Sequence, residues 1–527
     1  MAHSGHNKQR HMKWVGSGRR TFAAALAAVL LVPSFGTAWT ARTASHSTVI
    51  DPSLSAGEVA LVHTTAGHAG ALSLLLTELG ASEAQTEASV DTVIARLSPR
   101  ALTAVKSDPE VLVATSDTRI VMTGGGEGDL DTIGNPSPAD SVGLLAVNGP
   151  RAWHDSTGKG VTVAVMDSGI AEHPDLKGKV KTRVDFVQDG SALLDPAGHG
   201  THIAGLIAAN GEMKGVAPDA RLVSLRVLDA NGDGKLSNVV KAFDWLLDHR
   251  KQANVEVLNV SWGAPQATSY HKDLLSALVE SAWFAGITVV VAAGNSGPGT
   301  NTVTSPAADP FVVSVGSFDD QGTAATGDDV ESAFSSRGLT LDSFAKPDVL
   351  APGRHVISLR AVGAANESAK PQDLRHSRRD ATGPAEYIRM SGTSASAGFA
   401  SGVAALIVAD HHTYGPTQVK GAILAGARAM SGTSAPALDA ANAIDARGAA
   451  NVGLHPSKLL LSVLMSQGVK LKGITWEGVT WEGITWESIT WEQIRWQSVS
   501  WETVSWESVS WETVTWEGVV WEKVMAR

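Results

Sequence analysis

The chain has 527 residues and a mass of 54.7 kDa, and its 42 Lys and Arg against 53 Asp and Glu give a net charge of −11. A hydrophobic share of 43% with 18% charged residues is typical of a globular protein with several domains. The acidic balance argues against a nucleic-acid partner, and the absence of cysteine excludes disulfides, thiolate metal sites and a thiol nucleophile.

Residues 1–38 have the order of a secretory signal peptide. A basic stretch that ends at Arg19 and Arg20 precedes an apolar run at 22–32 and small residues up to Ala38, after which we expect cleavage. The apolar run is shorter than the roughly 20 residues that a spanning helix needs. We therefore expect a secreted protein with no permanent membrane span. The paired arginines leave both general and twin-arginine export open.

Residues 39–125 are expected to contain a small α/β unit. Apolar, strand-like runs alternate there with helical patterns, at 59–63, 69–79, 90–94, 99–105 and 111–121. Glycines and charges at 124–131 then predict a flexible boundary.

Residues 126–452 are predicted to form an α/β domain, a doubly wound three-layer sandwich with a mainly parallel sheet. Five Val-rich runs are apolar on both faces, as buried parallel strands are: 161–167, 221–228, 255–263, 287–295 and 311–317. Four helical patterns would cover the sheet: 201–209, 239–249, 274–284 and 399–409. Because ligands bind at the carboxyl ends of such strands, the residues just beyond them are the candidates for chemistry.

Three clusters in this domain supply an acid, a base and a hydroxyl. Asp167 ends the first strand in DSGI, His199 lies between glycines in DPAGHGTHIAG, and Ser394 lies in YIRMSGTSASAG. A serine nucleophile needs an imidazole as base, and the imidazole needs a carboxylate to fix its tautomer. Each motif alone is ordinary, but together, in this order and at strand ends, they indicate nucleophilic catalysis.

With these motifs the sequence resembles the subtilisin-like (subtilase) serine proteases over residues 142–446. The order Asp, His, Ser is that of subtilisin itself. The resemblance implies that Asp167 is the orienting carboxylate, His199 the general base and acid, and Ser394 the nucleophile. It also implies that Asn295, in AAGNSG, is the side-chain donor of the oxyanion hole.

The resemblance further implies polypeptide substrates and a groove to bind them. Two strand segments would line the groove and the primary pocket: Ser261, Trp262, Gly263, Ala292, Ala293 and Gly294. Thr304 would stand near the pocket floor, shorten the pocket and favour modest apolar side chains at the cleaved position. A second SGTSAP motif, which contains Ser434, is interpreted as a loop because no comparable strand precedes it.

Residues 39–125 are, by the same resemblance, an inhibitory propeptide that the protease cuts from itself within about residues 122–139. No cofactor is required for the chemistry. Asp175 in HPDL resembles a calcium ligand of the family, but the partner loop is cut to NGEMKG. The ligand set for structural calcium is therefore incomplete, and the metal site is left unassigned.

Residues 473–527, after a linker at 453–472, form a repeat tail. Ten tryptophans recur at a strict spacing of five from Trp476 to Trp521, mostly followed by Glu. Neither a continuous strand nor a helix keeps this spacing on one side, whereas a coil of short strands does so better. An extended tail is the alternative. Ten Trp side chains look too large for the narrow pentapeptide solenoid of the same period. The tail would bind a cell wall or glycan, associate with another copy, or only maintain solubility.

The sequence thus predicts a secreted serine endopeptidase made as a self-processed precursor, with cell-surface association left open. The alternative is a cell-surface binding or structural protein whose tail carries the function and whose protease fold is silent. The set Asp167, His199, Asn295 and Ser394 favours the enzyme, because a silent fold has no need to keep all four.

Overall fold

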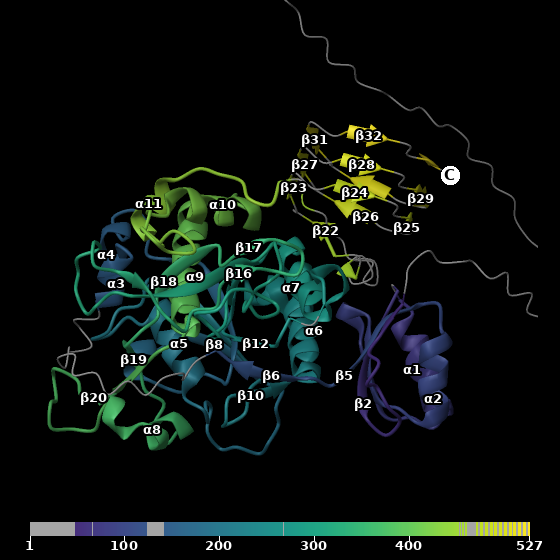
Figure 1. Ribbon diagram of the computed structural model, residues 1–527, viewed down its shortest axis with the longest axis horizontal. Coiled ribbons are helices and arrows are strands. Elements are labelled where there is room, and N and C mark those ends of the chain that lie inside the picture. The colour runs from purple at the N-terminus through teal and green to yellow at the C-terminus, as the bar shows by residue number, and fades with distance from the viewer. Residues whose placement is uncertain are drawn as a thin grey trace, which may run out of the picture. The chain divides into compact units, whose positions relative to one another are not determined.

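The computed structural model describes residues 48–65, 67–123, 142–266, 268–452, 454, 456–457 and 459–460, and the backbone of short strands between 471 and 526. In Figure 1 the colour follows the chain from purple to yellow, and many of these elements are labelled. The predicted signal peptide and the glycine-rich boundary at 124–131 lie outside the described residues.

The N-terminal unit is a five-stranded sheet with two helices (Figure 1, purple), in the strand order β1-β5-β2-β4-β3. The elements are β1 (Val49–Ile50), β2 (Val59–Thr64), α1 (Ala69–Glu78), β3 (Ser82–Glu87), β4 (Thr92–Arg96), α2 (Pro99–Ser107) and β5 (Val111–Ser116). The helix α2 begins where Pro99 fixes its first residue and Ser98 accepts a hydrogen bond from the Ala101 N–H at 3.0 Å. Leu72, Leu76 and Val105 belong to a core that this unit forms by itself.

The expected single strand at 111–121 is instead two strands, β5 and β6 (Arg119–Met122). Asp117 leaves the sheet between them because its carboxylate accepts hydrogen bonds from the N–H and Oγ of Ser237, both at 2.9 Å, at the start of α6 (Leu236–Ala253). As a result β6 pairs antiparallel with β10 (Asp233–Lys235) and β12 (Trp262–Gly263) of the large unit.

The large unit is built on an eight-stranded sheet, in the order β15-β14-β13-β11-β7-β9-β8 with β18 also paired to β14. All pairs are parallel except β14 with β15, which confirms the predicted mainly parallel α/β sheet. The strands are β7 (Thr162–Asp167), β8 (Val180–Asp185), β9 (Arg221–Arg226), β11 (Val255–Val260), β13 (Thr288–Ala292), β14 (Val313–Asp319), β15 (Val330–Glu331) and β18 (Val349–Pro352). Every residue of β7, β13 and β14 is buried, so both faces of the sheet are covered.

The covering helices pack in two pairs, α5 (His199–Ala208) with α9 (Thr393–Asp410) and α6 with α7 (Leu274–Phe284). The helix α9 begins six residues before the expected run at 399–409. Among the described residues it alone has the length and hydropathy of a membrane span, but 89% of it is buried in the protein core. Its small residues allow this close packing: a Cβ at Gly402 would come within 2.5 Å of Val216.

Shorter elements connect these layers. They are α3 (Val142–Ala146), α4 (Gly149–Ala152), β16 (Gly338–Leu339), β17 (Ala345–Lys346), β19 (Val356–Leu359), α8 (Ala365–Ala369), β20 (Leu374–Arg375), β21 (Tyr387–Met390), α10 (Pro416–Gly426) and α11 (Ala440–Asp445). The strand β21 leads directly into the turn before α9, so it brings the Ser394 motif to the sheet edge.

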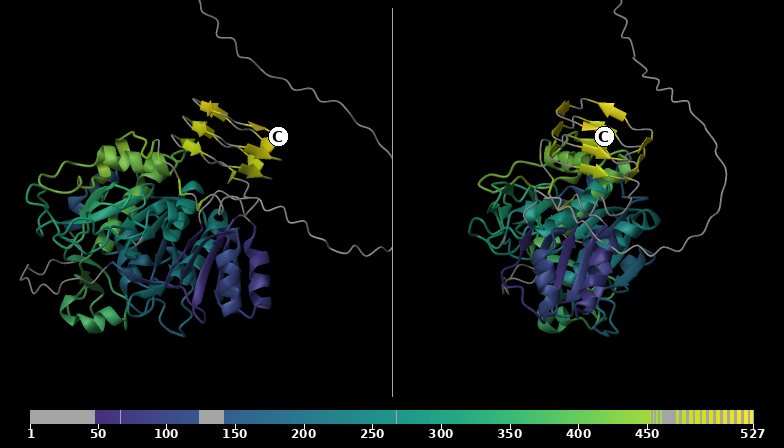
Figure 2. Two further views of the ribbon diagram at one scale, coloured as in Figure 1. Left: turned by 45° about the vertical axis from the view of Figure 1, so that its right-hand side comes forward. Right: turned by 90° about the vertical axis from the view of Figure 1, so that its right-hand side faces the viewer.

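The tail backbone is a four-sided coil in which each strand pairs in parallel with the strand 20 residues later, as Trp476 does with Trp496 and Trp496 with Trp516. Figure 2 shows these yellow strands stacked in layers. The backbone thus follows a coil of short strands, and its path is that of a pentapeptide solenoid, the likeness that the sequence analysis disfavoured because of the size of the Trp side chains. The strands are β22 (Leu471–Lys472), β23 (Thr475–Glu477), β24 (Thr480–Glu482), β25 (Thr485–Glu487), β26 (Thr490–Glu492), β27 (Arg495–Gln497), β28 (Ser500–Glu502), β29 (Ser505–Glu507), β30 (Ser510–Glu512), β31 (Thr515–Glu517), β32 (Val520–Glu522) and β33 (Met525–Ala526).

Candidate active site

Asp167 and His199 meet at the carboxyl end of the central strand β7. Asp167 is the last residue of β7 and His199 the first of α5, and Asp167 Oδ1 lies 2.7 Å from His199 Nδ1. The helix approaches the strand this closely because the next residue is Gly200, where a Cβ would stand 2.1 Å from the carbonyl oxygen of Gly169. Both side chains are buried, so their interaction is shielded from water.

The electrostatics of this pair favour a base that binds its proton firmly. Burial alone would lower the pKa of His199, but the charge and hydrogen bond of Asp167, together with the charge of Asp195, outweigh burial, so the pKa is raised above its ordinary value. The Nε2 atom of His199 is buried and has no hydrogen-bond partner among the described residues. That nitrogen is thus available to accept a proton from a nucleophile.

A second buried carboxylate, Asp195, holds the turn before His199, and the sequence analysis missed it. Its oxygens accept hydrogen bonds from the N–H of Gly198 at 2.8 Å, from the N–H and Oγ1 of Thr201 at 2.8 and 2.6 Å, and from the Oγ of Ser168 at 2.7 Å. Burial raises the pKa of Asp195 despite these donors. The only signal in the sequence is an aspartate four residues before the histidine.

Ser394 is the second residue of α9 and lies against the N-terminal unit. Its Oγ lies 2.8 Å from the Oγ1 of Thr123 and donates to the carbonyl oxygen of Ser261 at 3.2 Å. No hydrogen bond joins Ser394 to His199. The structure therefore brings Asp167 and His199 into direct contact, while the hydroxyl of Ser394 is engaged by Thr123.

The side-chain amide of Asn295 also contacts Thr123 of the N-terminal unit. Its Oδ1 accepts hydrogen bonds from the N–H and Oγ1 of Thr393, both at 3.0 Å, which turns Nδ2 toward the carbonyl oxygen of Thr123, to which Nδ2 donates. This is the geometry required of an oxyanion-hole donor. The orienting residue Thr393 is a further position that the sequence analysis did not assign.

The groove predicted from the sequence holds the strand β6. Met122 pairs with Trp262 and Val121 with Gly263, and the N–H of Thr123 donates to the carbonyl oxygen of Ser261 at 3.0 Å. Residues 119–123 therefore lie extended, as a peptide bound by strand addition does.

The residues predicted to line the groove contribute mainly their backbone atoms. The indole of Trp262 is fully buried and its Nε1 donates to the carbonyl oxygen of Met166 at 2.9 Å, so only the Trp262 backbone faces β6. Ala292 and Ala293 are also fully buried. The carbonyl oxygen of Ala293 accepts hydrogen bonds from the N–H and Oγ1 of Thr304, at 3.0 and 3.2 Å.

Thr304 lies between the two glycine segments of the predicted pocket. A Cβ at Gly263 would stand 2.6 Å from Thr304 Oγ1, and a Cβ at Gly294 would stand 3.0 Å from Thr304 Cγ2. Gly294 also has a φ of +111°, which favours glycine. Glycine at both positions leaves room for the Thr304 side chain.

Asp175 does not fit a calcium ion. Its carboxylate already accepts hydrogen bonds from the N–H groups of Glu212 and Met213, at 3.0 and 2.9 Å, and from the hydroxyl of Tyr387 at 2.9 Å. The backbone of the NGEMKG loop thus occupies both oxygens of this carboxylate. Within the described part of the chain, no group of three or more His, Cys, Asp or Glu is placed to hold a metal ion.

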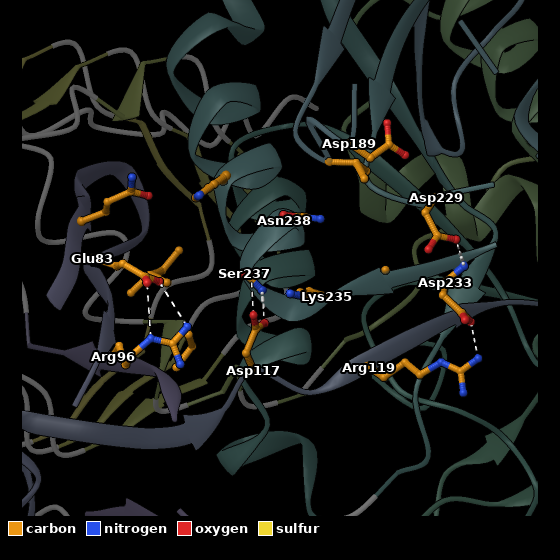
Figure 3. A pocket seen from close by; sticks show the side chains of 16 residues that line it. Glu83, Arg96, Asp117, Arg119, Asp189, Asp229, Asp233, Lys235, Ser237 and Asn238 are labelled. Carbon is orange, nitrogen blue, oxygen red and sulfur yellow. Dashed lines mark hydrogen bonds and ion pairs between the residues drawn. The ribbon is translucent and has the colours of Figure 1, made fainter. Parts of the chain in front are cut away.

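A cavity of about 750 Å³ beside β6 separates the N-terminal sheet from the loop before α6. Figure 3 shows Glu83 and Arg96 on one side of it and Asp229 and Asp233 on the other. Outside this gap the two units share an apolar contact, because Leu61, Val90 and Ile94 of the N-terminal unit belong to the large core. Specific polar contacts add to it. One of them is the capping of α6 by Asp117, and another is the hydrogen bond from the Ser89 N–H to Asp244 Oδ1 at 2.5 Å.

Comparison with known proteins identifies the large unit. Residues 158–448 match the Subtilase family. The serine protease AprX of Bacillus subtilis is 39% identical over 274 residues, which are 50% of this chain and 60% of AprX. Subtilisin E of the same organism is 33% identical over 287 residues (53% and 63%), and the M-protease of Shouchella clausii is 30% identical over 330 (62% and 70%). The matched residues thus span about three fifths of the length of AprX and Subtilisin E. With more than half of its length matched, the chain belongs to the Subtilase family.

Proposed function

We propose that the protein is a secreted serine endopeptidase, made as a precursor that cuts off its own N-terminal unit. The observation that carries the proposal is the position of Thr123, whose carbonyl oxygen accepts a hydrogen bond from Asn295 while β6 fills the groove. When the peptide bond after Thr123 is held in this way, its carbonyl carbon is open to attack by the hydroxyl of Ser394. The cleaved bond would be Thr123–Gly124, inside the interval predicted from the sequence.

In the proposed reaction, Ser394 Oγ turns away from Thr123 Oγ1 and attacks the Thr123 carbonyl carbon, while its proton passes to Nε2 of His199. The carbonyl oxygen becomes negative and is stabilised by Asn295 Nδ2 and the Ser394 N–H. The imidazolium then protonates the nitrogen of Gly124, the peptide bond breaks and an ester joins Thr123 to Ser394. Water, deprotonated by His199, hydrolyses this ester, and the proton returns to Ser394.

The cut N-terminal unit would inhibit the protease until it dissociates. After cleavage β6 would still pair with β10 and β12 and keep other peptides out of the groove. Once it leaves, other polypeptides would be the substrates. The position of Thr304 supports a pocket for residues of modest size, of which Thr123 is an example.

Labelling with a serine-directed fluorophosphonate tests the proposal. The processed wild-type protein should be labelled in a single position, and a Ser394→Ala variant should remain both unlabelled and uncut. A chain that folds, stays uncut and resists the label would instead be the silent binding protein, and the enzyme proposal would be wrong.

We propose in addition that the tail associates with the tail of another copy. In support, the tail strands pair in parallel with equivalent strands 20 residues away, and such repeated strands can pair in the same way with those of another copy. Deleting residues 473–527 should abolish oligomers seen by light scattering and leave peptidase activity unchanged. Oligomers that survive the deletion would contradict this proposal, and a monomer that adsorbs to cell walls through the tail would replace it.

A further inference from the structure

A short segment between the family-matched residues 158–448 and the tail is buried at most of its described residues. Its described residues, which we call the strap, are Leu454, Pro456, Ser457, Leu459 and Leu460. The strap contacts two parts of the chain that the proposed cleavage would separate.

On the protease side, the strap is fixed to α7 and the loop before it. The Ser457 N–H donates to Glu280 Oε2 at 2.8 Å, and Ser457 Oγ donates to the carbonyl oxygen of His271 at 3.3 Å. Glu280 is a fully buried residue of α7, and Leu460 is fully buried in the large core. The strap therefore has a defined position on the protease.

On the other side, the strap touches the N-terminal unit. Leu459 is 5% exposed and forms a separate apolar cluster with Leu112 and Val113 of β5 and Ala277 of α7. The carbonyl oxygen of Leu459 also lies 3.1 Å from Nε2 of His63, a fully buried residue of β2. Residues almost 400 positions apart thus share one contact.

These contacts form a further attachment of the N-terminal unit, in addition to β6 in the groove, the hydrogen bonds of Asp117 and Ser89 to α6, and the apolar side chains that enter the large core. We propose that the strap is part of the binding site for the N-terminal unit, so that the segment leading into the tail controls how long the cut propeptide stays bound. The inference rests on the proposed self-cleavage. Dissociation of the N-terminal unit would expose the Leu459 side chain to water. This cost slows release of the unit.

The test uses the full-length chain and follows two time courses after the protein folds. Gel analysis follows cleavage of the precursor, and a small chromogenic peptide reports free active sites. The interval between the two curves measures release of the cut N-terminal unit. Leu459→Ala should leave the cleavage rate unchanged and speed release by about tenfold, the change that about 1.4 kcal/mol produces.

Matched variants separate this effect from a folding defect. Leu112→Ala leaves the sequence of the processed enzyme unchanged and should speed release to a similar extent. The double variant should speed it by less than the product of the two single effects, because the two leucines share one contact. Val452→Ala, at a residue that is 63% exposed just before the strap, should behave as wild type.

Each outcome bears on a different claim. Release at the wild-type rate in both Leu459→Ala and Leu112→Ala would overturn the role of the strap. A wild-type chain in which activity appears together with cleavage would instead contradict inhibition by the N-terminal unit. A Leu459→Ala enzyme with normal kcat/KM after release shows that its fold is intact.

Discussion

The hydroxyl oxygens of Thr123 and Ser394 lie 2.8 Å apart, and each also lies within hydrogen-bond distance of the carbonyl oxygen of Ser261, at 3.0 and 3.2 Å. The two hydroxyl groups have one proton each, so they can form only two of these three hydrogen bonds at a time. Whichever hydroxyl donates to the carbonyl, the proton of Ser394 points to Ser261 or Thr123 and not to His199. The arrangement therefore competes with activation of the nucleophile.

Removing the Thr123 hydroxyl should speed self-cleavage. Thr123→Val keeps the branched shape and deletes the competing hydrogen bond, whose net worth of about 0.5–1.5 kcal/mol corresponds to a roughly two- to tenfold faster first-order rate. Thr123→Ser keeps the hydroxyl and should cleave at close to the wild-type rate. Equal rates for the Val and Ser variants would show that the hydroxyl exerts no restraint.

Peptidase activity should rise with pH through a midpoint above 6.5, the ordinary pKa of histidine. His199 accepts a proton only when neutral, and Asp167 holds its pKa above the ordinary value despite burial. Activity is therefore lost as the pH falls through this raised pKa. Asp167→Asn removes the negative charge and should move the midpoint of kcat/KM down as well as lower the rate. A wild-type midpoint at or below 6.5 would contradict this assignment.

Asn295→Ala should lower kcat with little change in KM. Removing the corresponding donor from subtilisin costs about 10² to 10³ in kcat, and we expect a loss of that order here. Thr393→Val should give a smaller loss of the same kind, because the amide remains but is no longer held by the Thr393 hydroxyl. Steady-state kinetics on a peptide substrate separate the two constants. A change confined to KM would assign both residues to ground-state binding.

Two glycines of α9 should respond differently to alanine. A Cβ at Gly402 would stand 2.5 Å from Val216 Cβ, so Gly402→Ala should destabilise the fold by about 1–3 kcal/mol. A Cβ at Gly398 meets no side-chain atom closer than 3.3 Å, and the gain in helix propensity offsets the tighter contact, so Gly398→Ala should change stability by less than about 1 kcal/mol. Denaturant unfolding of the inactive Ser394→Ala precursor measures both. Equal effects would contradict the packing argument.

Local patterns were sufficient to predict the elements that carry the site. Strands that are apolar on both faces, such as β7 and β13, indicated the buried sheet, and the polar residues at or just beyond their carboxyl ends, Asp167 and Asn295, were placed at its edge. Hydrophobic periodicity and strand-end chemistry both depend on neighbours in sequence, which explains this success.

Features that depend on distant residues were not predictable in this way. The break between β5 and β6 occurs because Asp117 caps a helix more than a hundred residues later, and Trp262 faces the core because Met166 accepts its indole N–H. Burial of Leu459 against β5 has no signal in either segment. Such contacts are set by tertiary packing, which the local pattern does not encode.

The mass of the protein after folding tests the central claim most directly. If Ser394 cuts the bond that follows Thr123, the wild-type chain should yield a C-terminal product that begins at Gly124, and purified Ser394→Ala should keep the two parts joined under the same conditions. A first cut at another bond, or normal cleavage of purified Ser394→Ala, would contradict the account.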